Sequence, residues 1–177
     1  MKISVAVDVQ NDFIDGSLGC DKNREITKRI INRIKKARNT IFFATMDTHG
    51  PDYLKTSEGK KLPIEHCIFE TKGWELADEL KKKVDPSTRV TKNTFGSETL
   101  VQRIKYLVDE YLDKGEKLEI ELFGFCLSIC VISNALLLKA AFPEAEIRVV
   151  KDLCGDIDEE SKQAAVKVLE NCQIEIV

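Results

Sequence analysis

Residues 118–141, LEIELFGFCLSICVISNALLLKAA, decide the fold of this chain. The first six residues, LEIELF, predict a buried strand over residues 118–123. A strongly apolar run then predicts a buried helix over residues 129–141. A buried strand that leads into a buried helix is the building unit of α/β proteins.

Outward from this segment, the rest of the chain repeats the alternation. Strands are expected over residues 3–9, 40–45, 88–91, 147–150 and 174–177. Helices are expected at Ile26, Ile30, Ile31 and Ile34, with Asn23 placed to cap the start, and over residues 74–82, 100–111 and 159–169. This alternation implies right-handed crossovers and a mostly parallel sheet covered on both faces. We therefore expect one domain, residues 1–177, with a three-layer α/β/α, Rossmann-like fold and six strands.

Charge and hydropathy exclude several classes of function. The chain has 27 basic and 30 acidic residues with interspersed signs, so it offers no general field for DNA, RNA or an anionic membrane surface. The longest uncharged run, residues 122–138, falls just short of a bilayer span, and residues 1–13 show no signal-peptide pattern. Six dispersed cysteines favour reduced thiols in a cytoplasmic protein. A homo-oligomer is compatible with the composition but is not determined by it.

Several chemical groups are expected at one edge of the predicted sheet. In parallel sheets, ligands bind outside the carboxyl ends of the strands. Candidate groups follow four of these strand ends: Asp8, Asp47 with His49, Lys92, and the segment from Cys126 to Cys130. A long stretch without clean periodicity, residues 46–73, follows the second strand and supplies His66. The sequence therefore predicts a functional site at this edge.

Cys130 is a candidate nucleophile because it opens the helix that follows the turn. Backbone N–H groups and the helix dipole there would favour a thiolate and provide donors for an oxyanion. Asp8 could accept the thiol proton, and Lys92 could stabilise the negative charges. Each residue also has a plain alternative: Cys126 and Cys130 as packed core cysteines, Asp8 as a loop cap, and Lys92 as a solvated lysine.

Asp47, His49 and His66 are candidate metal ligands. One oxygen and two imidazole ligands suit Zn²⁺, Fe²⁺ or Mn²⁺ and leave coordination positions open. Extended residues two apart point the same way, so Asp47 and His49 can meet one ion, which His66 would close from the long loop. Glu58 is a further candidate, although an exposed loop glutamate is the simpler interpretation. The alternative for the histidines is two polar loop residues without a metal.

Five motifs together carry a family resemblance. They are VDVQNDF at residues 7–13, MDTH at 46–49, LPIEHC at 62–67, VTKNTFGS at 90–97 and G-x-x-x-x-x-C-V at 124–131. In this order, over most of the chain, they resemble the isochorismatase-like cysteine hydrolases, and within that superfamily most closely the nicotinamidases. The combination is much more specific than any single motif. The resemblance implies hydrolysis of a small amide, such as a pyridine carboxamide, to a carboxylate and ammonia through a thioester.

The resemblance also implies roles for individual residues. It implies a catalytic triad of Asp8, Lys92 and Cys130. It implies one divalent ion, zinc before iron or manganese, held by Asp47, His49 and His66. A cis peptide bond between Phe125 and Cys126 would turn the Cys126 and Cys130 amides toward an oxyanion, and Phe13 and Trp74 would line the substrate pocket.

Departures from the family pattern keep other functions open. Leu127-Ser128 stands where relatives often carry Thr-Asp, the segment after Phe13 is compressed, and His66 is followed by CIFETKGWE in place of the usual Gly-Thr pattern. One alternative is a hydrolase of the same family that acts on another small amide, a carbamoyl compound or a vinyl ether. Another is a redox or metal-binding module that uses Cys126 and Cys130.

Overall fold

The computed structural model describes residues 1–177 and contains a six-stranded sheet. Its strand order is β3-β2-β1-β4-β5-β6, and every pair of neighbours is parallel. The strands are β1 (Lys2–Val7), β2 (Ile41–Asp47), β3 (Arg89–Lys92), β4 (Glu119–Gly124), β5 (Glu146–Cys154) and β6 (Glu175–Ile176). The predicted six-stranded sheet is therefore confirmed, and it is parallel throughout.

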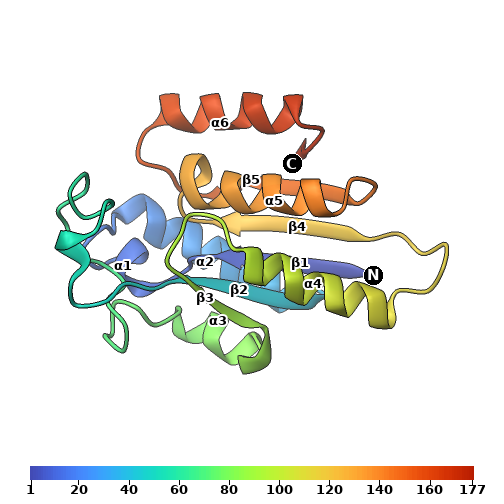
Figure 1. The fold of residues 1–177 in the computed structure, drawn as a ribbon, viewed down its shortest axis with the longest axis horizontal. Coiled ribbons are helices and arrows are strands. Elements are labelled where there is room, and N and C mark those ends of the chain that lie inside the picture. Colours follow the sequence, from blue (N-terminus) through green and yellow to red (C-terminus); the bar gives the residue numbers. More distant parts are fainter.

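Helices cover both faces of this sheet (Figure 1). One face carries α2 (Asp21–Lys36) and α3 (Asp78–Lys83), and the other carries α4 (Glu98–Tyr111), α5 (Ile132–Ala141) and α6 (Glu159–Asn171). The chain runs from β1 outward through β2 to β3 and then crosses to β4, β5 and β6. Right-handed crossovers in these two directions place the two sets of helices on opposite faces, which gives the predicted three-layer α/β/α fold.

The core forms where the apolar faces of the helices meet the sheet. On β1, Ile3, Val5 and Val7 are each at most 1% exposed. On α2, Ile26, Ile30 and Ile34 recur at helical spacing and are buried. Burial of one such aliphatic side chain contributes about 1.5–3 kcal/mol. Because β1 and β4 lie at the centre of the sheet, covered on both sides, the groups at their carboxyl ends have a rigid support.

The start of α2 differs from the prediction. The helix begins at Asp21 with Cys20 as the preceding residue, so Asn23 lies inside the first turn and does not cap it. Asn23 is buried, and its Nδ2 donates a hydrogen bond of 2.8 Å to the carbonyl of Phe13. The compressed segment 15–20 brings the short helix α1 (Asn11–Ile14) against α2. Asn23 therefore links the two helices through its side chain and does not cap α2.

The helix predicted over residues 74–82 is shorter, because α3 begins at Asp78. Residues just before it are held in extended conformation by the segment after β1: Gln10 bridges Leu76, and the Ala77 N–H donates to the carbonyl of Val9. Long-range hydrogen bonds thus replace the first turn of the predicted helix. The three short helices α1, η1 (Tyr53–Lys55) and η2 (Pro86–Thr88) have no counterpart in the sequence prediction.

The transition from β4 to α5 contains a π-helical turn, Leu127–Val131. The predicted helix from residue 129 is thereby divided, and α5 itself starts at Ile132. Gly124 precedes this turn with a φ of +134°, and a Cβ there would lie 1.9 Å from the Val7 carbonyl oxygen. A glycine is therefore required where β4 leaves the sheet beside β1.

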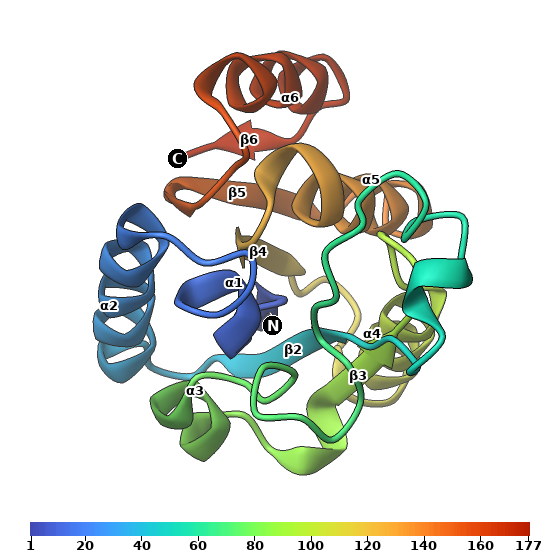
Figure 2. The same ribbon diagram turned by 90° about the vertical axis from the view of Figure 1, so that its left-hand side faces the viewer.

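Figure 2 views the sheet from the carboxyl ends of its strands, where the segment between β2 and α3 arches across the edge. Parallel register aligns Val7 with Gly124 and Asp47 with Lys92, so the chain leaves neighbouring strands at similar heights. The residues that follow these strands therefore lie close together at one edge of the sheet, as predicted.

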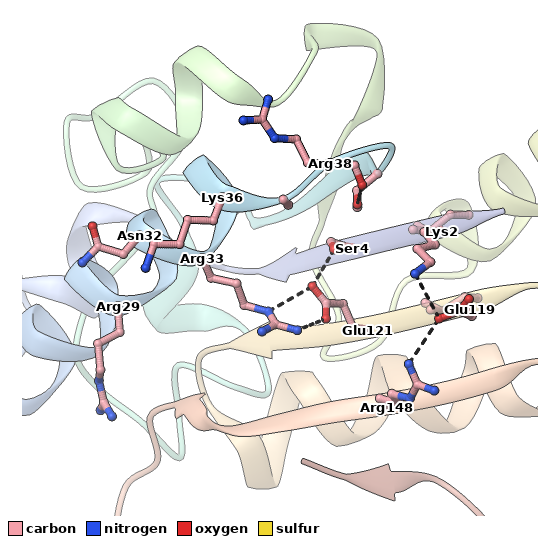
Figure 3. A pocket seen from close by; sticks show the side chains of 14 residues that line it. Lys2, Ser4, Arg29, Asn32, Arg33, Lys36, Arg38, Glu119, Glu121 and Arg148 are labelled. Carbon is pink, nitrogen blue, oxygen red and sulfur yellow. Dashed lines mark hydrogen bonds and ion pairs between the residues drawn. The ribbon is translucent and has the colours of Figure 1, made fainter.

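A groove of about 600 Å³ lies between α2 and the amino-terminal halves of β1 and β4 (Figure 3). Its acidic groups are already paired. Glu121 accepts a hydrogen bond from the Ser4 hydroxyl and forms an ion pair with Arg33. Glu119 forms ion pairs with Lys2 and Arg148. None of the candidate site residues lies in this groove. The helices of the protein are all too short or too polar to span a lipid bilayer.

Candidate active site

Asp8, Lys92 and Cys130 meet at the carboxyl edge of the sheet. The Lys92 Nζ lies 2.7 Å from Asp8 Oδ2 and 3.6 Å from the Cys130 Sγ. All three residues are buried, with Asp8 fully enclosed. Each comes from a different strand end: Asp8 follows β1, Lys92 ends β3, and Cys130 lies in the turn after β4. The arrangement joins a base, a cation and a thiol in one hydrogen-bonded group.

Burial and mutual charge set the protonation of this group. Burial raises the pKa of Asp8, although the Lys92 cation works against that rise. Burial also raises the pKa of the Cys130 thiol well above its ordinary value, and the negative charge of Asp8 adds to the rise. Burial alone would lower the pKa of Lys92, but the surrounding negative charges outweigh it and raise that pKa. Lys92 is therefore held as a cation, and burial keeps Cys130 in its neutral thiol form.

Asp8 is oriented by a threonine that the sequence analysis did not identify. The Thr45 hydroxyl donates a 2.6 Å hydrogen bond to Asp8 Oδ1, and the Asp8 N–H lies 3.2 Å from the same hydroxyl oxygen. Asp8 adopts a positive φ of 51°, which turns its carboxylate off the line of β1 toward the edge. The remaining oxygen, Oδ2, is the one that faces Lys92. Thr45 thus holds one oxygen of Asp8 and leaves the other to face Lys92.

The turn after β4 brings a backbone donor beside the thiol. The peptide bond between Phe125 and Cys126 is cis, which confirms the prediction drawn from the resemblance. The Cys126 N–H makes no hydrogen bond within the protein. An amide that stays free beside a nucleophile is available to a developing oxyanion.

The two cysteines of this turn have different environments. Burial, followed by the negative charge of Asp156, raises the pKa of Cys126 to about 12. Cys130, unlike Cys126, has the Lys92 ammonium within contact of its sulfur. All six cysteines are free in the structure. The Lys92 ammonium lowers the pKa of Cys130 against the effect of burial, and Cys126 has no such cation beside it.

A cluster of metal-binding side chains lies next to the triad. One ligand atom from each of four residues lies within 4.8 Å of the others: Asp47, His49, Glu58 and His66. Asp47 Oδ2 lies 3.0 Å from His49 Nε2 and 3.5 Å from His66 Nε2, and Glu58 Oε1 lies 3.8 Å from both imidazoles. The simple interpretation of Glu58 as an exposed loop residue is wrong, because its carboxylate is half-buried among the other three.

Neighbouring groups hold these side chains in place. The Gln10 side chain clamps Asp47, with its Oε1 2.7 Å from the Asp47 N–H and its Nε2 2.8 Å from the Asp47 carbonyl. His66 Nδ1 lies 2.8 Å from the carbonyl of Ile64, which directs Nε2 toward the cluster. Asp12 accepts the N–H of Cys67 at 2.7 Å and so ties down the loop beside His66. Such support of the ligands is typical of built metal sites.

The donor set fits a divalent transition metal. Two imidazoles and two carboxylates, with both ring Nε2 atoms turned inward, suit Zn²⁺, Fe²⁺ or Mn²⁺. Burial would raise the pKa of Asp47, but hydrogen bonds from the two histidines and the Lys92 charge lower it. Asp47 is thus kept as a carboxylate, the form that binds a cation, and it links the cluster to Lys92 at 3.4 Å.

A cavity of about 450 Å³ opens onto both groups. Its walls include Asp47 and His66 from the donor cluster and Cys126 and Cys130 from the turn. Phe13 lines it and packs edge-on against the His66 ring, at a centroid distance of 5.6 Å. Trp74 does not line this cavity. Its ring packs on Phe69, and its Nε1 donates a 2.8 Å hydrogen bond to Thr48, because the extended residues before α3 carry it away.

A family model described as the isochorismatase domain matches residues 2–177 of the chain. The chain belongs to the isochorismatase family. A search of curated protein sequences found no significant match.

Several solved structures share the fold of this isochorismatase-family protein. A pyrazinamidase/nicotinamidase from Streptococcus mutans is 23% identical, with a TM-score of 0.80 over 100% of both chains. The yeast nicotinamidase bound to the inhibitor nicotinaldehyde is 22% identical, with a TM-score of 0.79 over 100% of this chain and 99% of its own. The pyrazinamidase of Pyrococcus horikoshii in complex with zinc is 22% identical, with a TM-score of 0.77 over 99% of this chain and 98% of its own.

The structure of this family member brings together eight of the nine residues that the sequence analysis placed in the site, and leaves Trp74 aside. It adds residues that the analysis missed, namely Thr45 beside Asp8, Gln10 beside Asp47, and Asp156 beside Ser128. A polar residue at an inward position of a buried strand is a signal that could have identified Thr45. Gln10 and Asp156 lie in irregular segments, where no periodicity shows which way a side chain points.

Proposed function

We propose that this protein is a metal-containing cysteine amidohydrolase that converts a small carboxamide, most simply a pyridine carboxamide, to a carboxylate and ammonia. One observation carries the proposal: Cys130, which contacts the Lys92–Asp8 pair, lines the same cavity as three members of the donor cluster, Asp47, Glu58 and His66. A thiol with a base and a cation supplies a nucleophile, and the donor cluster can orient the substrate.

The first half of the reaction forms a thioester. Asp8 accepts the Cys130 proton while Lys92 stabilises the charged pair, and the thiolate sulfur attacks the carboxamide carbon. The carbonyl oxygen becomes an oxyanion, which the free Cys126 amide can receive. The carbon–nitrogen bond then breaks, and the departing nitrogen takes the proton from Asp8 to leave as ammonia.

The second half regenerates the enzyme. Asp8, again ionised, accepts a proton from water, and the hydroxide oxygen attacks the thioester carbon. The carbon–sulfur bond breaks, Cys130 recovers its proton from Asp8, and the product leaves as a carboxylate after giving its remaining proton to solvent. A divalent ion held by Asp47, His49, Glu58 and His66 would act as a Lewis acid that polarises and orients the substrate.

The cavity suits a small and largely apolar substrate. Its volume of about 450 Å³ is near the lower end for small-molecule sites, and nine of its fifteen lining residues are hydrophobic. Phe13 supplies an aromatic surface next to His66, where a flat ring can pack. The bound nicotinaldehyde of the yeast relative is a molecule of this kind.

The test is ammonia release from nicotinamide, pyrazinamide and simple carbamoyl compounds, measured with and without a chelator. We expect turnover of a pyridine carboxamide that Cys130→Ala abolishes and that the matched variant Cys126→Ala retains. Full amidase activity in Cys130→Ala would refute the mechanism. Inactivation by an alkylating agent should follow the modification of Cys130, whereas a reversible disulfide between Cys126 and Cys130 would support a redox module instead.

A related hydrolase of another small amide, a carbamoyl compound or a vinyl ether is the second candidate. The position of Trp74 outside the cavity favours it, because one of the two expected aromatic walls is missing. The same panel decides: turnover of a carbamoyl compound without any pyridine carboxamide would select this candidate. Metal analysis of the purified protein adds a second measurement, since bound zinc, iron or manganese supports the principal proposal.

We further propose that residues 1–177 act as one domain in a reducing, cytoplasmic setting. The family match over residues 2–177 supports the first statement, and the six free thiols support the second.

A further inference from the structure

Both carboxylate oxygens of Asp156 accept hydrogen bonds from the turn that carries Cys130. Asp156 lies in the loop after β5, and its Oδ2 accepts the backbone N–H of Ser128 at 2.8 Å. Its Oδ1 accepts the Ser128 hydroxyl at 2.5 Å and the N–H of Ile157 at 2.9 Å. Asp156 also lines the catalytic cavity. No step of the proposed reaction uses this half-buried carboxylate.

The segment that Asp156 holds lies between the two cysteines of the site. Ser128 is in the π-helical turn, and the preceding amide, Leu127 N–H, donates to the Gly155 carbonyl of the same loop at 2.9 Å. Two consecutive amides after Cys126 are therefore fixed by the loop after β5. The turn then closes back, because the N–H groups of Ile129 and Val131 both donate to the Cys126 carbonyl.

These contacts leave one amide free at the start of the turn. With its carbonyl bound on one side and the next two amides bound on the other, the Cys126 peptide has little freedom to rotate, and its own N–H keeps no partner within the protein. The carboxylate that fixes the turn comes from another loop, and the hydroxyl of Ser128 donates to it.

We propose that Asp156 is the positioning residue of the oxyanion site: through Ser128 it fixes the turn so that the Cys126 amide faces the carbonyl under attack by Cys130. The inference rests on the proposed function. It makes the loop after β5 a working part of the site, although that loop supplies no group that touches the reacting atoms.

A purely structural cap would show the same hydrogen bonds, and the chain provides a matched example. Asp158, two residues further on, accepts the Ser161 N–H at 2.7 Å and the Ser161 hydroxyl at 3.1 Å, where it caps α6. It thus makes the same pair of contacts to a serine, but the helix it caps carries no residue of the site. Asp158→Ala is therefore the control for Asp156→Ala.

The experiment compares both variants in three measurements: melting temperature, kcat and KM for the best carboxamide, and affinity for pyridine-3-carboxaldehyde. The aldehyde reports the oxyanion site directly. The Cys130 sulfur bonds to its carbonyl carbon, and the carbonyl electron pair moves to the oxygen, which takes the proton from Asp8. The carboxylate product, which forms no such bond, is the reference ligand.

We expect Asp156→Ala to lower kcat and aldehyde affinity by about 10- to 100-fold, with KM and product affinity changed less than about threefold. Asp156→Asn, which keeps one acceptor for Ser128, should recover part of the loss. Asp158→Ala should lower the melting temperature without changing kcat or aldehyde affinity. Equal effects of the two alanine variants on kcat and aldehyde affinity would overturn the inference.

The aldehyde also separates this inference from the proposed function. If the protein forms the Cys130 adduct but hydrolyses no carboxamide, the amidase proposal fails, and aldehyde affinity alone decides the role of Asp156. If the wild-type protein forms no adduct and releases no ammonia, both proposals are overturned.

Discussion

Thr45→Val isolates the control of the catalytic base by a single hydroxyl. The Thr45 hydroxyl donates a 2.6 Å hydrogen bond to Asp8 Oδ1 and is fully buried. Valine has nearly the same shape, so the change removes the hydrogen bond and leaves the packing of β2 in place. Asp8 keeps its contact with Lys92 through Oδ2.

The size of the effect follows from the charge of the acceptor. A hydrogen bond to an ionised group contributes about 1.5–3 kcal/mol. Because the bond stabilises the carboxylate form, its loss should raise the pKa of Asp8 by about 1–2 units, at about 1.4 kcal/mol per unit. The reaction needs Asp8 ionised, so activity rises with pH through this pKa. Burial already raises the pKa of Asp8 above its ordinary value, and the variant should move the acidic limb of the profile further upward.

The assay is the pH profile of kcat/KM from ammonia release. We expect the acidic limb to shift upward by about 1–2 pH units, with activity recovering toward the wild-type value on the alkaline side. The control is Thr27→Val, which removes another buried threonine hydroxyl, one that donates to the Asn23 carbonyl and makes no hydrogen bond to Asp8. A uniform loss at every pH, or an unshifted limb, would refute the assignment of Thr45 as the residue that tunes Asp8.

Three further predictions concern the cation, the donor cluster and the turn. Lys92→Met leaves Asp8 and Asp47 without their shared cation and should lower the free energy of unfolding by about 3–5 kcal/mol in urea titrations, less at acidic pH where Asp8 binds a proton; an unchanged midpoint would contradict the ion pair. Glu58→Gln should weaken zinc binding by about 10- to 100-fold in competition with a chromogenic chelator, whereas Glu65→Gln in the same loop should not; equal affinities would remove Glu58 from the ligand set. Gly124→Ala should lower the melting temperature far more than Gly115→Ala, because both glycines have positive φ but only at Gly124 would the new Cβ collide with the Val7 carbonyl.

The sequence predicted the sheet well because its strands are short apolar runs with polar residues at their ends. Asp8 and Lys92 were placed correctly for that reason, since the carboxyl ends of parallel strands converge on one edge. The predictions were less accurate where long-range contacts replace local propensity. Asn23 does not cap α2, because its side chain binds the Phe13 carbonyl of α1. The helix α3 starts later than predicted, because the segment after β1 forms hydrogen bonds with the residues before it.

The long segment between β2 and α3 carries two side chains whose directions depend on tertiary contacts. It has no periodicity, so the direction of Glu58 or Trp74 depends on what the folded chain places next to each of them. Glu58 turns inward to the histidines, and Trp74 turns outward to Phe69 and Thr48. Neither direction could be read from neighbouring residues.

By itself, the sequence determined which residue types stand at which strand ends. It therefore determined that a thiol, a carboxylate, an amine and two imidazoles share one edge of the sheet. Local hydrophobic periodicity and the geometry of parallel strands are sufficient for that. Only the tertiary structure decided which neighbours hold these groups: Thr45 on Asp8, Gln10 on Asp47, and Asp156 on the turn between the cysteines. Each of these contacts joins residues at least 28 positions apart, and such contacts form only once the whole sheet and its loops have packed.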